Sequence, residues 1–258
     1  MSGEWGASDL STYPGGWQQP PQNQGPNRRL LLILTPFLVL LVAAAATGIG
    51  VLTRDAAAEE IPGIPTAAGS SSAPANVSAD GAVRIGEPDA QVTVRVVMDL
   101  QCPACKAFEA ANGKVLADAV RDGTAAVEYS VITFLDRAST TEYSSRAGNA
   151  SFCVANSGVD HYQSWLSEMF TEQPEEGGDG LPDSALIDIA ESAGYTDPAV
   201  AQCITDRQYD TYLRTETDEV LNSGVNSTPT VIVDGAEVTD ANALMSPNGL
   251  AAVIAAAR

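Results

Sequence analysis

The sequence predicts an α/β domain that is interrupted by a block of helices and preceded by one membrane-spanning helix. Three runs rich in β-branched and apolar residues predict the central strands, at Val92–Met98, residues 125–134 and Thr230–Val233. The chain between the second and third runs has helical spacing instead, over about residues 138–222. Near the N-terminus, residues 30–52 form an uncharged, largely apolar run of 23 residues.

The uncharged run is long enough to cross a membrane, because a helix rises 1.5 Å per residue and a bilayer core is about 30 Å thick. Arg28 and Arg29 precede it, whereas acidic residues soon outweigh Arg54 after it. This asymmetry predicts a cytoplasmic N-terminus and an extracytoplasmic main domain at the cell membrane. The alternative is a cleaved signal peptide with small residues at 43–46. Both interpretations place the domain in an oxidising compartment.

Composition divides the rest of the chain. We expect residues 1–29 to be a disordered cytoplasmic tail and residues 53–80, rich in Ala, Ser, Pro and Gly, to be a flexible linker. Residues 81–258 form the predicted domain. The 33 acidic residues exceed the 13 Lys and Arg, so the net charge is −20 and a nucleic-acid partner is excluded.

The elements of the domain follow in order. Val83–Ile85 predicts a short edge strand, and Val92–Met98 predicts a strand buried on both faces because it is nearly all apolar. Pro103 suits the first turn of a helix, and residues 106–120 continue with helical spacing. Residues 125–134 predict the next buried strand.

Further helices are expected at residues 141–155, 161–170, 183–193 and 206–222. Asp234-Gly235 then predicts a hairpin between Thr230–Val233 and a return strand at residues 236–238. A last helix is expected at residues 248–257. Strand, helix, strand, hairpin and helix, with a helical insertion in the middle, is the order of the thioredoxin fold.

The chemistry is carried by Cys102-Pro103-Ala104-Cys105, between a strand and a helix start. Unpaired N–H groups at a helix N-terminus stabilise a thiolate, so we expect a low pKa for Cys102. Cys105, one turn on, can resolve a mixed disulfide with Cys102, and Pro103 pre-sets the turn. A zinc site is disfavoured because Cys153, Cys203 and the single His161 lack metal-ligand spacing. We expect no metal and no cofactor.

A second signal is the segment Ser227-Thr228-Pro229-Thr230. A proline directly before a central strand is unwelcome unless it has a special role. We expect a cis Thr228–Pro229 bond beside the dithiol, where the exposed backbone of Thr228 can pair with an extended substrate. The alternative is an ordinary loop before a strand.

With these motifs, the chain resembles the DsbA/BdbD-like branch of the thioredoxin superfamily, in an actinobacterial, membrane-anchored form. The resemblance covers about residues 83–257. It implies a thiol–disulfide oxidoreductase that forms disulfides in reduced exported proteins. It also implies reoxidation by a membrane quinone-linked partner of DsbB or VKOR type. Since the sequence has no dimerisation domain, we expect a monomer.

One residue departs from the family. DsbA carries a histidine between its cysteines that helps to stabilise the thiolate, and here the position is Ala104. We therefore predict a less oxidising couple. A disulfide reductase or isomerase on the same fold stays open as an alternative, as does a tethered binding module without catalysis.

The remaining cysteines, Cys153 and Cys203, are expected to form a structural disulfide because two cysteines left over in an oxidising compartment usually pair. The closed loop would stabilise the fold by roughly 4 kcal/mol. Two free thiols or a second redox relay are the alternatives.

Three other polar residues are not assigned to the reaction. Asp99 has two interpretations, a group that assists proton transfer or a solvated or helix-capping carboxylate. Glu109 is expected on an exposed face, and His161 is expected to pack against aromatic neighbours.

Overall fold

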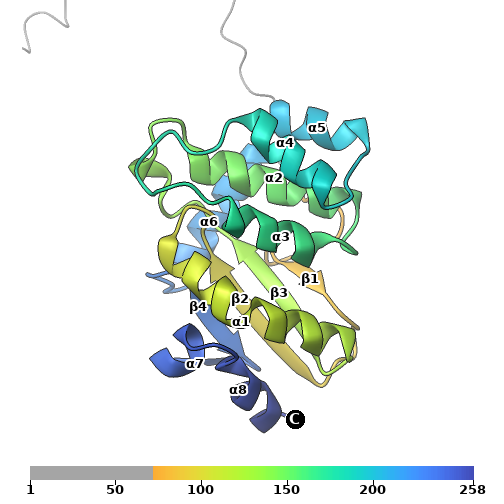
Figure 1. Cartoon of the computed structure of the whole chain (residues 1–258), viewed down its shortest axis with the longest axis vertical. Helices are drawn as coiled ribbons and strands as arrows, with labels where there is room; N and C mark the ends of the chain where they lie inside the picture. Colours follow the sequence, from red (N-terminus) through yellow and green to blue (C-terminus); the bar gives the residue numbers. More distant parts are fainter. Residues whose placement is uncertain (1–71) are drawn as a thin grey trace, which may run out of the picture. The chain divides into compact units, whose positions relative to one another are not determined.

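The computed structural model describes residues 72–258 (Figure 1). The predicted tail, the membrane-spanning run and most of the linker lie outside these residues. Within residues 72–258, no helix combines the length and the apolarity that crossing a membrane requires. The contacts of the domain begin before residue 81, since the Asn76 side-chain amide donates to the Ala155 carbonyl and Val77 forms a β-bridge with Val83.

The described residues form one mixed sheet, one 3₁₀ turn and a set of helices. The strands are β1 (Val83–Ile85), β2 (Val92–Met98), β3 (Ala125–Val131), β4 (Thr230–Val233) and β5 (Ala236–Glu237). The helical elements are α1 (Pro103–Arg121), η1 (Asp136–Ala138), α2 (Tyr143–Ser157), α3 (Tyr162–Thr171), α4 (Asp183–Ser192), α5 (Pro198–Thr205), α6 (Asp210–Asn222), α7 (Ala241–Met245) and α8 (Leu250–Ala256).

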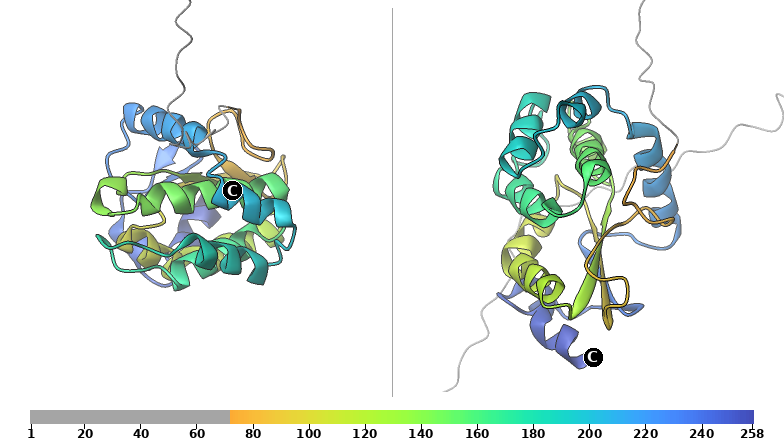
Figure 2. Two further views of the ribbon diagram at one scale, coloured as in Figure 1. Left: turned by 90° about the horizontal axis from the view of Figure 1, so that it is seen from above. Right: turned by 90° about the vertical axis from the view of Figure 1, so that its right-hand side faces the viewer.

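The strands lie in the order β1-β3-β2-β4-β5. Strands β2 and β3 are parallel, as a strand–helix–strand unit requires, and all other pairs are antiparallel. Helix α1 covers one face of the sheet together with α7 and α8, and α6 lies on the other face (Figure 2, right). Helices α2 to α5 form the insertion above the sheet (Figure 1). This arrangement is the thioredoxin fold that the sequence predicts.

The helical insertion packs closely on the rest of the domain. Helix α2 contacts α5 and α6, and α3 contacts α1. Gly148 lies where α2 meets α6, and a Cβ atom there would be 2.6 Å from Leu213 Cδ2. The aromatic side chains of Tyr162, Trp165 and Phe152 are fully buried in this region. Their burial makes the insertion part of one continuous core with the sheet.

Several predicted boundaries differ from the structure. The strand predicted to reach residue 134 ends at Val131, since the Thr133 amide turns away to the hydroxyl of Thr217 on α6. The helix predicted over residues 206–222 begins only at Asp210, after Arg207 adopts a left-handed φ of 51°. Cys203 lies near the end of α5.

Helix α7 was not predicted at all. It has only five residues, Ala241–Met245, and the side chain of Asp240 caps it by accepting a hydrogen bond from the backbone amide of Asn242.

On the face of the sheet that α6 covers, strand β2 is less buried than its apolar sequence suggested. Thr93 and Arg95 are only half-buried, because α6 leaves part of that face uncovered.

Candidate active site

The dithiol lies between the end of β2 and the start of α1. Cys102 is the N-cap residue of α1 and Pro103 is the first helical residue, as predicted. The Cys102 amide donates to the Asp99 carbonyl at 3.0 Å, and the Cys102 carbonyl accepts the amide of Lys106 at 3.2 Å. Cys102 is 7% exposed and Cys105 is fully buried. Both are free thiols, and of the two residues only Cys102 keeps contact with solvent.

The two thiols have opposite pKa shifts. The pKa of Cys102 is lowered from 9.0 to about 6, chiefly by a hydrogen bond from the Cys105 thiol, which outweighs the effect of burial. The Thr228 hydroxyl and the backbone N–H groups of Cys105 and Ala104 lower it further. The pKa of Cys105 is raised well above its usual value, first by burial and then by the neighbouring Cys102. The site therefore holds one thiolate and one thiol at neutral pH.

The Thr228–Pro229 segment meets the dithiol from β4. Its peptide bond is cis, which confirms the sequence-based expectation. Cys102 Sγ lies 3.5 Å from the Thr228 carbonyl oxygen, although the two residues are 126 positions apart in sequence. Thr228 and Pro229 are half-buried. The Thr230 hydroxyl donates to the Ser227 carbonyl and holds the turn. The loop and the dithiol thus form one surface at the end of the sheet.

Asp99 is not a solvated carboxylate, contrary to one of the two interpretations of the sequence. It is fully buried, and its carboxylate accepts from the backbone amides of Gln101 and Leu135 and from the Ser144 hydroxyl, each at 2.8 Å. Burial raises the pKa of Asp99 to about 6, and the nearby Cys102 contributes to that rise. Asp99 therefore joins the loop before Cys102 to η1 and α2.

Two further residues hold the active-site loop and were missed by the sequence analysis. The side-chain amide of Gln173 donates to the carbonyls of Leu100 and Cys102, at 2.8 and 3.1 Å. The Lys106 ammonium donates to the carbonyls of Thr171 and Gln173. No local pattern marks Gln173, because it lies 71 residues from Cys102 and follows α3.

Cys153 and Cys203 form a disulfide, as predicted, with a sequence separation of 50 residues. It joins α2 to α5 and both residues are buried, so it lies inside the insertion. His161 packs edge-on against the ring of Tyr195, as expected. Glu109 was expected on an exposed face, but it is half-buried with an unpaired carboxylate oxygen, and burial raises its pKa to about 7.

Among residues 72–258, no three His, Cys, Asp or Glu side chains are grouped to hold a metal ion. What the site does contain is a reactive thiolate, a buried resolving thiol and an adjoining backbone carbonyl. These are the groups that a thiol–disulfide oxidoreductase uses.

Comparisons with known proteins agree with this class. The thioredoxin family matches residues 78–255. The reduced form of the disulfide bond oxidoreductase DsbG from Mycobacterium tuberculosis is 30% identical, with a TM-score of 0.58 over 67% of this chain and 85% of that one. Reduced DsbA from the same organism is 29% identical, with a TM-score of 0.55 over 69% of this chain and 99% of that one.

The chain therefore belongs to the thioredoxin family and is similar to its thiol–disulfide oxidoreductases of DsbA type. It is also 32% identical over 127 residues to the serine/threonine-protein kinase PknE of Mycobacterium tuberculosis. That match covers 47% of this chain and only 22% of the kinase, so it concerns a minor part of the kinase.

Proposed function

We propose that this protein is an extracytoplasmic thiol oxidase that introduces disulfides into exported proteins through Cys102 and Cys105. The observation that carries the proposal is the pairing of the two thiols. Cys102, at the start of α1, has a low pKa and borders solvent, whereas Cys105 beneath it is buried with a high pKa. A stabilised thiolate favours the reduced form of the couple, which makes the oxidised form a better oxidant.

In the proposed reaction, a substrate thiolate attacks Cys102 Sγ of the Cys102–Cys105 disulfide. The bond between the two enzyme sulfurs breaks, and Cys105 leaves and takes up a proton because its pKa is high. A second substrate thiolate then attacks the substrate sulfur of the mixed disulfide, and Cys102 leaves as a thiolate. The substrate loses two electrons and two thiol protons, and the enzyme ends as the dithiol.

Thr228 and Pro229 are the proposed substrate-binding residues. The Thr228 carbonyl lies 3.5 Å from Cys102 Sγ, so a chain attached to that sulfur passes next to this backbone. A substrate in extended conformation can hydrogen-bond to it as an added strand. Backbone pairing does not depend on side chains, which suits an enzyme that acts on many unfolded substrates.

The buried Cys153–Cys203 disulfide supports an oxidising compartment, since such bonds rarely persist in the cytosol. We place the domain outside the cell membrane, with residues 30–52 as its single-pass anchor and the N-terminus in the cytoplasm. The reduced enzyme needs an oxidant to turn over, and we propose a membrane quinone-linked protein of DsbB or VKOR type. The expected catalytic form is a monomer.

The test is oxidation of a reduced, unfolded protein with two cysteines by the oxidised full-length chain in detergent. Substrate thiols should disappear with the stoichiometry of one disulfide per enzyme. Cys102→Ser should abolish the reaction. Cys105→Ala has no disulfide of its own and should not oxidise the substrate. When its Cys102 carries glutathione, this variant should exchange the glutathione for a substrate with a single cysteine and stop at the mixed disulfide. Met245→Ala, at an exposed position of α7, is the control and should leave the rate unchanged. Undiminished oxidation by the Cys102→Ser variant would show that the assignment is wrong.

One observation favours the opposite direction of electron flow as a second candidate. Ala104 supplies only its backbone N–H to the thiolate, and the pKa of Cys102 is about 6. A milder oxidant can also act as a reductase or isomerase, according to the potential of its partners. The equilibrium potential of the couple distinguishes the two.

A further inference from the structure

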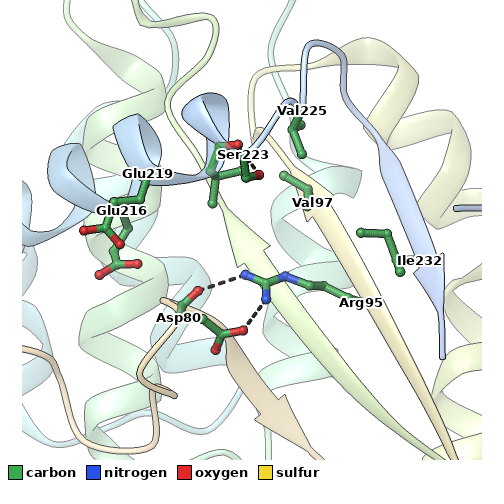
Figure 3. Close-up of a pocket in the computed structure, with 9 residues that line it drawn as sticks. Asp80, Arg95, Val97, Glu216, Glu219, Ser223, Val225 and Ile232 are labelled. Carbon is green, nitrogen blue, oxygen red and sulfur yellow. Dashed lines mark hydrogen bonds and ion pairs between the residues drawn. The ribbon is translucent and has the colours of Figure 1, made fainter. Parts of the chain in front are cut away.

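A hollow of about 300 Å³ lies between α6 and the partly uncovered face of the sheet (Figure 3). It belongs to neither the dithiol nor the disulfide. Its lining comes from three parts of the chain: the segment before β1, the paired strands β2 and β4, and α6 with the loop that follows. The residues are Asp80, Arg95, Val97, Glu216, Glu219, Val220, Ser223, Val225 and Ile232.

The hollow is close to the proposed substrate-binding loop. Val225 precedes Thr228 by three residues, and an extended chain spans at most about 3.6 Å per residue, so the two are within about 11 Å. In the sheet, Val97 pairs with Thr230, the residue directly after Pro229. A polypeptide bound along Thr228 can therefore reach the hollow with a side chain about three or four residues from its reactive cysteine.

The only base in the lining is already occupied. One Arg95 nitrogen forms an ion pair with the Asp80 carboxylate. The other donates to the Asp80 carbonyl at 2.8 Å and to the Ser130 hydroxyl at 2.7 Å. Arg95 therefore balances Asp80, and Figure 3 shows Arg95 joined to Asp80 by dashed lines.

Two carboxylates of α6 remain without a basic partner. Neither Glu216 nor Glu219 forms an ion pair with a Lys or Arg in the described part of the chain, residues 72–258. Glu216 is 7% exposed, and burial raises its pKa. A hydrogen bond from Tyr212 opposes this rise, and the charges of Glu219 and Asp80 add to it. Its carboxylate lies against Gly81, where a Cβ atom would be 2.2 Å from Glu216 Oε2. The hollow thus has more acidic than basic groups, and Glu219 and Glu216 are the ones without a basic partner.

Four of the other lining residues are aliphatic. Val97 and Ile232 come from the sheet, and Val220 and Val225 from α6 and its loop. An aliphatic floor with carboxylates at one side matches a lysine or arginine side chain, which packs its methylene stem on apolar surface and keeps its charged end at an anion. A neutral or acidic side chain would leave Glu219 and Glu216 without a basic partner.

We propose that this hollow is a specificity pocket for a lysine or arginine side chain of the substrate, about three or four residues from the cysteine that reacts with Cys102. The inference rests on the proposed function and refines its substrate class. It identifies Glu219, with Glu216, as the residues that select basic segments among unfolded exported proteins.

The test uses single-cysteine peptides that differ only in a lysine, norleucine or glutamate placed two to five residues on either side of the cysteine. Each is allowed to displace glutathione from Cys102 of the full-length Cys105→Ala protein, and the mixed disulfides are quantified by mass spectrometry. At one position, the lysine peptide should be preferred over the norleucine peptide by about threefold to fivefold, the upper part of the range of an exposed ion pair. The ratio should fall to about one in a Glu219→Gln background.

Asp218→Asn is the matched control, because Asp218 is exposed on α6 like its neighbour Glu219 but does not line the hollow. It should keep the preference for lysine, and comparison across variants cancels any effect of lysine on the peptide thiol itself. The proposal would be overturned by equal lysine-to-norleucine ratios in the Cys105→Ala protein and in its Glu219→Gln and Asp218→Asn derivatives. An equal loss of the preference in both derivatives would also overturn it. Failure of every peptide to exchange at Cys102 would instead count against the proposed function.

Discussion

Ala104→His tests how the first turn of α1 sets the strength of the oxidant. With a Cys102 pKa of about 6, ionisation stabilises the dithiol form at pH 7 by about 1.4 kcal/mol. A DsbA thiolate with a pKa of about 3.5 gains about 4.8 kcal/mol in the same way. The difference of about 3.4 kcal/mol corresponds to about 70 mV for two electrons. Against about −120 mV for DsbA, we predict about −190 mV for this couple.

A histidine at position 104 has room, since Ala104 is half-exposed on the first turn of α1. A charge-assisted hydrogen bond from the imidazole to the thiolate is worth about 1.5–3 kcal/mol. The potential should therefore rise by about 30–60 mV, and the pKa of Cys102 should fall below 6. The first measurement is equilibration with glutathione buffers followed by alkylation of the thiols, and the second is the pH dependence of thiolate absorbance.

The control is Ala110→His, at an exposed position two turns further along α1, which should leave both quantities unchanged. A potential near −120 mV in the unaltered protein would refute the reasoning, since Ala104 would then not weaken the oxidant. So would an Ala104→His variant with an unchanged potential.

Three further predictions follow from the same contacts. Cys105→Ala removes the largest cause of the low pKa of Cys102, so the pH midpoint of its alkylation rate should rise by roughly 1–2 units, and an unchanged midpoint contradicts the hydrogen bond. Cys203→Ser opens the disulfide to Cys153 and should lower the free energy of unfolding in urea by about 4 kcal/mol, while Cys102 keeps its reactivity. Glu109 has its pKa raised to about 7, so its neutral form stabilises the fold below about pH 4.5, and this contribution is lost as the pH rises through 7. Glu109→Gln should therefore raise the melting temperature at pH 8 relative to the unaltered protein, with a smaller gain at pH 5.

Local sequence was sufficient for the strands and for the reactive pair. The β-branched composition of Val92–Met98 and Thr230–Val233 predicts strands with the bounds that the structure has. The spacing of Cys102 and Cys105 at a helix start determines their chemistry, because both the N-terminal N–H groups and the one-turn separation are local properties. The cis bond before Pro229 and the pairing of the two other cysteines also agree with the structure.

The surroundings of the dithiol depend on packing between segments that are distant in sequence. Asp99 is buried because α2 and η1 close over it, and Gln173 reaches Cys102 only because α3 ends beside α1. Likewise, the hollow beside Arg95 exists because α6 covers only part of the sheet. Burial and long-range hydrogen bonds are properties of how the elements meet, so the sequence alone determined the reacting groups, and the tertiary structure decided their pKa values and the surface that a substrate meets.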